Sequence, residues 1–189
     1  MTAFIIANGT SRVGFDLRLL SEAGVIYGCN AIYRTNPDDV DFVVAIDDGI
    51  IREIEQSDYE SKKVIIPPED ERWEPFECNA HRPRSNAGMN AMREAIKRGA
   101  KTIIGLGFDF MLIDESQSIS NIYDGTKNYG MGTRAHASDN IGRASYLDWL
   151  AKTNPSVDFI LCYKTIQSMH RMAATNISVI TYDQLKESL

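Results

Sequence analysis

The chain alternates short apolar runs with amphipathic stretches. The apolar runs are rich in Ile and Val and mostly do not alternate with polar positions: Ala3–Ala7, Val25–Tyr27, Phe42–Ala45, Lys63–Ile66, Thr102–Leu106, Asp158–Leu161 and Ser178–Thr181. Such runs are typical of strands that a parallel sheet buries on both faces. The pattern therefore predicts a mostly parallel sheet built from these strands.

Amphipathic stretches between the runs predict helices at Asp16–Ala23, Asp48–Ser57, Asn86–Arg98 and Asp139–Thr153. In the third stretch, Met89, Met92 and Ala95 fall on one face, and Gly99 can end the helix. Strands that alternate with helices imply right-handed crossovers and helices on both faces of the sheet. We expect one doubly wound α/β domain over residues 1–189, with three α/β/α layers.

Two stretches interrupt this alternation. Pro67–Arg84 carries four of the chain's prolines among charged residues, which predicts irregular structure. Met111–Ala135 follows a predicted strand and contains Gly125, Gly130 and Gly132 among Ser, Asn and Tyr residues. Loops of this length in a compact domain are usually lids, binding loops or disordered segments. We therefore expect a lid or binding loop over residues 111–135.

Composition narrows the class of protein. The 189 residues are 43% hydrophobic and 24% charged, which excludes a disordered or collagen-like chain. The net charge of −6 makes binding of nucleic acid or anionic lipid through overall charge unexpected. No apolar run approaches the roughly 18 residues of a membrane-spanning helix, and no signal-peptide pattern opens the chain. Three cysteines without metal spacing fit reduced thiols, so we expect a cytoplasmic protein.

Polar residues follow the predicted strands, at the sheet edge where α/β proteins bind ligands. Asn8-Gly9-Thr10-Ser11 follows the first strand, and Gly9 would let a ligand approach the backbone closely. Short donors at a helix start favour an anion, so this loop is a candidate phosphate cradle. The loop has no Walker lysine, and an ordinary N-cap and turn is an equally good interpretation.

The other strands end in further candidates for ligand binding. Asn30 can hydrogen-bond a base or a sugar hydroxyl, or can simply form a turn. Asp47 and Asp48 can bind ribose or a metal, although Asp48 can equally cap the next helix, and Asp109 follows the fifth strand. No Asp-X-Asp pair follows a strand, which disfavours a metal-dependent site.

Candidate catalytic groups come from the irregular stretches. Arg84 precedes the predicted cap residue Asn86 and can neutralise a phosphate, or can be an ordinary surface arginine. His136 ends the glycine-rich loop, and a histidine there can act as a general base or have a structural role. Tyr123 and Tyr129 can hydrogen-bond a leaving phosphate or pack the loop against the domain.

Several of these segments form an ordered series. The chain reads Phe-Ile-Ile-Ala-Asn-Gly-Thr-Ser at 4–11, Cys-Asn at 29–30, Arg-Ser-Asn-Ala-Gly at 84–88 and Gly-Leu-Gly-Phe-Asp-Phe at 105–110, with His136 before a helix that holds Tyr146–Leu150. This series resembles the bacterial family 42 sialyltransferases and related Rossmann-like glycosyltransferases. The corresponding family segments read Gly-Asn-Gly-Pro-Ser, Arg-Cys-Asn, Arg-Ile-Thr-Ser-Gly and Gly-Ile-Asp-Phe.

The resemblance implies a metal-independent glycosyltransferase without a cofactor, which takes a CMP-linked nucleotide sugar as donor and a glycan as acceptor. It implies nucleotide-side roles for Asn8, Gly9, Ser11, Asn30, Asn86, Ala87 and Gly88. His136 would deprotonate the acceptor hydroxyl, while Arg84 with Tyr123 or Tyr129 would offset charge on the departing phosphate. The loop at 111–135 would close over the donor and exclude water.

This sequence also departs from the family pattern. Thr10 stands where the family has proline, Ala87 replaces a serine, and Met111 replaces a tyrosine. Two alternatives therefore stay open. One is a metal-dependent phosphotransferase similar to the 6-hydroxymethylpterin pyrophosphokinase-like proteins, which share the opening motif. The other is a nucleotide-binding or assembly protein without activity. We also expect a homo-oligomer, because small transferases with short lids often associate.

Overall fold

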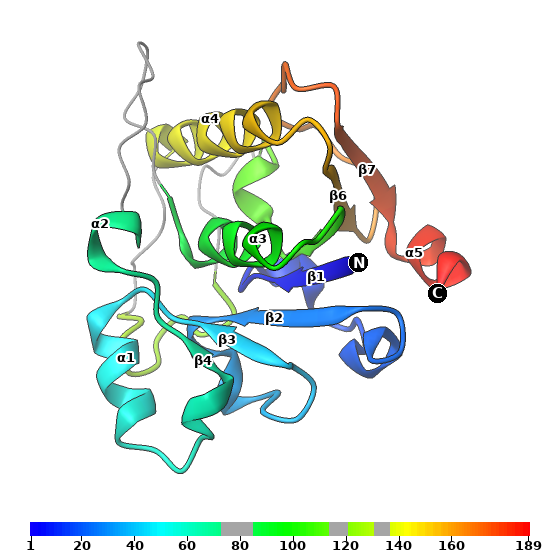
Figure 1. The fold of residues 1–189 in the computed structure, drawn as a ribbon. Coiled ribbons are helices and arrows are strands. Elements are labelled where there is room, and N and C mark those ends of the chain that lie inside the picture. Colours follow the sequence, from blue (N-terminus) through cyan, green and yellow to red (C-terminus); the bar gives the residue numbers. More distant parts are fainter. Residues whose placement is uncertain (73–84, 114–120, 131–136) are drawn as a thin grey trace.

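The computed structural model describes residues 1–72, 85–113, 121–130 and 137–189 (Figure 1). It contains seven strands: β1 (Thr2–Ile6), β2 (Val25–Cys29), β3 (Phe42–Val44), β4 (Val64–Ile65), β5 (Thr102–Leu106), β6 (Asp158–Tyr163) and β7 (Ile177–Thr181). All seven predicted strands are confirmed. Strand β2 continues through Gly28 and Cys29, two buried residues beyond its predicted end.

The seven strands form one sheet in the order β4-β3-β2-β1-β5-β6-β7, and every neighbouring pair is parallel. The chain fills one half of the sheet from β1 to β4, then crosses back to place β5 on the other side of β1. The predicted doubly wound, Rossmann-like α/β fold is thus confirmed. The direction of winding changes between β1 and β5, which is where such sheets bind ligands.

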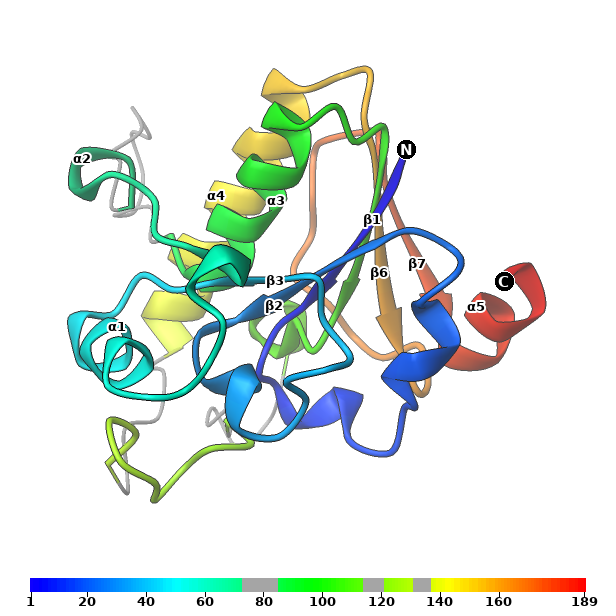
Figure 2. The ribbon, with the colours of Figure 1, turned by 60° about the horizontal axis from the view of Figure 1, so that its bottom comes forward.

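Two long helices, α3 (Ala87–Lys97) and α4 (Ala137–Thr153), lie side by side on one face of the sheet (Figures 1 and 2). The predicted stripe of Met89, Met92 and Ala95 is fully buried there. Gly99 takes the left-handed conformation (φ 90°) and ends α3 as predicted. This layer, with Ile5, Phe159 and other inward strand residues, forms the first of two hydrophobic clusters.

The opposite face is covered by short helices around a second hydrophobic cluster. They are α1 (Asp48–Glu55), α5 (Tyr182–Ser188) and the 3₁₀ helices η1 (Thr10–Arg12), η2 (Leu17–Leu20), η3 (Asn30–Arg34) and η4 (Ser61–Lys63), not all of which touch the cluster. The 3₁₀ helix η5 (Asp109–Met111) instead packs against α4 and adds Phe110 and Met111 to the first cluster. The predicted α-helix at Asp16–Ala23 is the 3₁₀ helix η2. Its buried residues, Leu17 and Leu20, are three apart, which suits a helix of three residues per turn.

Two short helices fall outside the predicted set. Helix α5 begins with a capping box, in which the Thr181 hydroxyl and the Gln184 side chain each bond the other's backbone amide. Helix α2 (Glu69–Arg72) lies within the stretch Pro67–Arg84, which we expected to be irregular, and the Pro68 carbonyl accepts from the Glu71 and Arg72 amides at its start. Within the described part of the chain, no helix is long and apolar enough to cross a membrane.

Candidate functional site

The predicted binding residues that the structure describes gather at the carboxyl edge of the sheet. The register aligns Ile6 of β1 with Gly28 of β2 and Leu106 of β5, so the segments that follow these strands start at one level. Helix α3 also begins at this edge, because a Cβ on Gly88 would touch the Phe108 ring just beyond β5. The residues brought together are Asn8, Gly9, Thr10, Ser11, Asn30, Asp47, Asn86, Ala87, Gly88 and Asp109.

The candidate phosphate cradle is occupied by a carboxylate of the protein itself. Asp109 accepts hydrogen bonds from the Ser11 backbone amide (3.0 Å), the Ser11 hydroxyl and the Thr10 hydroxyl (3.4 Å). Gly9 is required beside it, because a Cβ would overlap the Asp109 carboxyl group and the Gly107 carbonyl. A phosphate can use the Thr10 and Ser11 donors only if Asp109 moves away.

Asn8 has an unused acceptor at the end of β1. Its side-chain amide donates to the Cys29 carbonyl at 3.0 Å, which fixes the orientation of the amide group. The opposite atom, Oδ1, is buried and has no hydrogen-bond partner among the residues that the structure describes. A buried acceptor without a partner is costly, and in native structures it calls for an explanation such as a ligand or water.

Asn30 connects the ends of β2 and β3. It sits in the left-handed region (φ 49°), its Oδ1 accepts from the Ile46 amide at 3.1 Å, and its Nδ2 donates to Asp47 at 2.5 Å. Asp47 is open to solvent at the start of α1. The pKa of its carboxyl group is raised above the usual value, chiefly because the surrounding protein partly excludes water. The hydrogen bond from Asn30 acts in the opposite direction, and the charge of Asp48 raises the pKa further. Asn30 thus holds a solvent-exposed carboxylate at this edge of the sheet.

Tyr123 and Tyr129 belong to a segment that crosses the ends of β1 and β2. The amide of Ile122 donates to the Asn8 carbonyl at 2.9 Å, and the Tyr123 hydroxyl bonds Thr35 at 2.8 Å. Burial raises the pKa of both tyrosines, and the charge of Asp47 raises that of Tyr129 further. Both rings pack against the domain in this structure, and any role toward a leaving phosphate stays a prediction.

Arg34 also holds this segment in place. Its guanidinium bonds both carboxyl oxygens of Glu53 (2.6 and 2.7 Å), the Thr126 hydroxyl (2.9 Å) and the Lys127 carbonyl (2.9 Å). It also lies 5.9 Å from the ring centre of each tyrosine. Residues 121–130, which we call the strap, are therefore tied to η3 and α1 by charged hydrogen bonds.

Asn86 is the N-cap residue of α3. The Asn86 side chain accepts from the Met89 amide at 3.0 Å, which satisfies an orphan donor of the first turn. Ala87 and Gly88 are buried, and Gly88 lets the helix approach Phe108. A direct role of these residues toward a base therefore stays a prediction. The two strongest catalytic candidates, Arg84 and His136, lie outside the described residues.

Arg12 is a buried cation at this edge that sequence reasoning missed. Only 7% of the residue is exposed, although η1 looks like an ordinary turn in the sequence. Its Nε donates to the Ala7 carbonyl at 2.7 Å, while Nη2 is buried without a partner in the described part of the chain. The burial arises from contacts distant in sequence, so no local pattern identifies this arginine.

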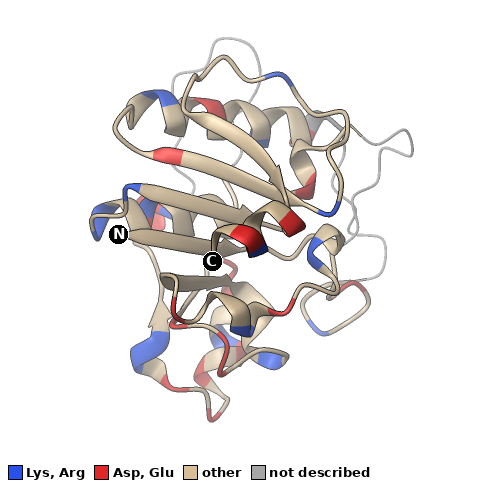
Figure 3. Cartoon of the chain, turned by 90° about the vertical axis from the view of Figure 1, so that its right-hand side faces the viewer, with Lys and Arg blue, Asp and Glu red and all other residues tan. Residues whose placement is uncertain are grey.

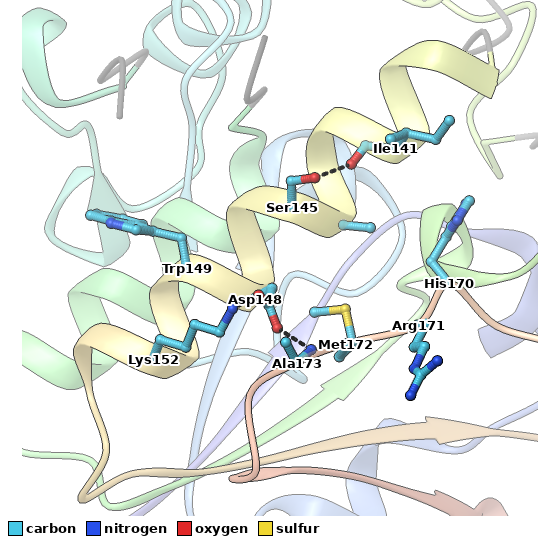
Figure 4. A pocket seen from close by; sticks show the side chains of 10 residues that line it. Ile141, Ser145, Asp148, Trp149, Lys152, His170, Arg171, Met172 and Ala173 are labelled. Atoms are coloured by element: carbon cyan, nitrogen blue, oxygen red, sulfur yellow. Dashed lines mark hydrogen bonds and ion pairs between the residues drawn. The ribbon is translucent and has the colours of Figure 1, made fainter. Parts of the chain in front are cut away.

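A groove of about 370 Å³ runs along the outside of α4 (Figure 4). His170 lies at the end near Ile141, and Lys152 lies at the other end. Asp148 accepts from the Ala173 and Ala174 amides at 2.7 Å and pairs with Lys152. Burial lowers the pKa of His170, which keeps it neutral at pH 7. Asp148 here holds the connection from β6 to β7 against α4, so its charge is already used in the fold.

Among the described residues, no group of three or more His, Cys, Asp or Glu side chains is arranged to hold a metal ion. The described carboxyl edge instead offers an unused acceptor on Asn8, a solvent-facing carboxylate on Asp47 and a buried cation on Arg12. This set can hydrogen-bond a polyhydroxylated ligand and balance an anion. The chain matches no protein-family model, no curated protein and no solved structure.

Proposed function

We propose that this protein is a metal-independent glycosyltransferase that binds a nucleotide sugar where β1, β2 and β3 end. The buried, unused Oδ1 of Asn8 carries the proposal, because it lies where winding changes direction and calls for a ligand donor. Sugar and ribose hydroxyls are such donors. Asp47, held by Asn30, adds a second acceptor for hydroxyl groups at the same edge.

The resemblance to family 42 sialyltransferases supports CMP as the nucleotide. In the proposed reaction, the acceptor hydroxyl oxygen attacks the anomeric carbon of the donor sugar, and the bond from that carbon to the phosphate oxygen breaks. CMP leaves with the bonding electron pair, and His136 takes the proton of the acceptor hydroxyl. Arg84 would offset the charge on the leaving phosphate.

Calorimetric titration with CMP, CDP, UMP, GDP and ATP, with and without magnesium, tests the proposed donor class. We expect micromolar binding of CMP that does not need magnesium. Binding that requires magnesium and prefers a nucleoside triphosphate would instead favour the pyrophosphokinase-like phosphotransferase. Absence of binding by all five nucleotides would contradict the proposal and favour an assembly protein.

His136→Ala then tests the chemistry separately from binding. Loss of a general base typically lowers the rate by about 10²–10⁴-fold, so turnover of a CMP-sugar should fall by this factor with the Kd for CMP unchanged. His170→Ala, in the groove on α4, is the matched control and should keep its turnover. Equal turnover in His136→Ala and the unmodified protein would refute the role of His136.

A further inference from the structure

The guanidinium of Arg12 forms no salt bridge with any residue that the structure describes. Its Nε donates to the Ala7 carbonyl, and the guanidinium also interacts with the Tyr123 hydroxyl, which is neutral. Its Nη2 is buried, and no described residue hydrogen-bonds it. Arginine keeps its charge under all ordinary conditions, so deprotonation cannot relieve the cost of burial.

Three titratable groups whose pKa values respond to the charge of Arg12 are neutral at pH 7. They are Cys29, Tyr123 and Tyr182, and burial raises the pKa of each, that of Cys29 to about 12. The charge of Arg12 lowers all three pKa values by a smaller amount. The nearby carboxylate of Asp109, which also acts on Tyr182, is already bonded to Ser11 and Thr10. Among the described residues, no salt bridge therefore pairs Arg12 directly with a carboxylate.

Arg12 and Asn8 each donate a hydrogen bond to a backbone carbonyl near the ends of β1 and β2. Arg12 bonds the carbonyl of Ala7, the residue before Asn8, while Asn8 bonds the carbonyl of Cys29. Both side chains are more than nine-tenths buried, and each keeps one unused polar atom, a donor on Arg12 and an acceptor on Asn8. Together they are complementary to a ligand that carries an anion next to a hydroxyl or amino group.

We propose that Arg12 binds the phosphate of the nucleotide ligand, while Asn8 accepts a hydrogen bond from the same ligand. This inference rests on the proposed function and names the group that recognises the anion. A phosphate ester is favoured over a carboxylate, because the guanidinium fork matches phosphate oxygens and nucleotides carry hydroxyls nearby. Arg12 is thus a binding residue additional to Arg84.

The test is titration of the full chain with CMP and with inorganic pyrophosphate, for the unmodified protein, Arg12→Met and Arg12→Lys. Arg98→Met is the control, since Arg98 is exposed and stacks on the Phe42 ring at 4.5 Å. Arg12→Met should weaken CMP binding about tenfold to a hundredfold, the usual worth of charged hydrogen bonds. Arg12→Lys should lose about tenfold, because it keeps the charge without the fork. Arg98→Met should bind CMP unchanged.

Thermal unfolding separates this role from a structural one. Without ligand, Arg12→Met should melt at the same temperature as the unmodified protein or higher, because an uncompensated buried charge is removed. The rise in melting temperature caused by CMP should disappear in this variant. An unchanged Kd for CMP in folded Arg12→Met, or in Arg12→Lys if the first variant does not fold, overturns the inference and leaves the proposed function standing. Arg12-dependent binding of pyrophosphate without binding of CMP supports the inference and contradicts the proposed function.

Discussion

Asp109 holds the loop after β1 by accepting hydrogen bonds from its backbone and hydroxyl groups. The sequence places Asp109 and the Asn8–Ser11 loop at one edge, because both follow strands of a parallel sheet. It does not reveal that the carboxylate fills the loop, since the contact joins residues about one hundred positions apart. The sequence thus predicts that these residues meet at one edge of the sheet, but it does not predict which hydrogen bonds they form.

Replacement of Asp109 tests this internal contact. Asp109→Ala leaves the partly buried Ser11 amide without its acceptor, so the free energy of unfolding should fall by about 1–3 kcal/mol. Urea denaturation measures the change, and Asp109→Asn, which keeps an acceptor oxygen, should lose less. The control is Asp158→Ala, which removes an exposed carboxylate at the start of β6. Equal stability of Asp109→Ala and the unmodified protein would show that the loop does not depend on Asp109.

Asp47 allows a prediction about pH. Its pKa is raised in the folded state, so the folded protein favours the protonated carboxyl. The resulting stabilisation is present at acidic pH and is lost as the pH rises through the folded pKa. Asp47→Asn should therefore raise the free energy of unfolding at pH 7, by less than about 1 kcal/mol because the group is open to water. The gain should shrink as the pH falls toward 4, and a gain that is constant with pH would exclude this explanation.

Among the elements, the strands and long helices were predictable and the short ones largely were not. Apolar runs identify strands because both faces of this sheet are buried, and the Met89 stripe identifies α3 because it packs on one face. Helix η2 buries only Leu17 and Leu20, which is too little pattern to separate a 3₁₀ helix from an α-helix. The start of helix α5 could have been predicted, because Thr181 and Gln184 have the spacing of a capping box.

The strap is the element whose position depends most clearly on one ion pair. Arg34→Ala removes its bonds to Glu53, Thr126 and Lys127, and the half-buried Glu53 loses its charged partner. Stability should fall by about 2 kcal/mol, and the amides of Ile122 and Tyr129 should exchange hydrogen faster. Arg18→Ala breaks a similar but exposed pair with Asp16 and should change neither quantity. Unchanged exchange in Arg34→Ala would show that other contacts hold the strap.

At the scale of the molecule, one sheet separates two hydrophobic clusters that share its strands. Alternate residues of β1 point into opposite clusters, with Ile5 in the first and Phe4 in the second. Acidic and basic residues are spread over the elements in view rather than gathered by sign (Figure 3). The apolar pattern predicted this layered architecture well, because it depends only on which positions are buried.

Because the clusters share a sheet, they should unfold together. Leu147→Ala in the first cluster and Leu20→Ala in the second each empty a fully buried position and should cost about 2–5 kcal/mol. Leu19→Ala, at the exposed neighbour of Leu20, is the matched control and should have little effect. Calorimetry should show one transition at a lower temperature in both core variants. Two separate transitions in either variant would mean that the layers are independent.

The central claim is that a nucleotide binds where β1 and β2 end. Titration of ¹⁵N-labelled protein with CMP in metal-free buffer, followed by amide chemical shifts, tests it most directly. We predict saturable shifts at Asn8–Arg12, Asn30 and Asp109, with residues of the groove on α4 unaffected. The absence of shifts at saturating CMP, or shifts confined to Ser145 and His170–Ala173, would contradict the claim.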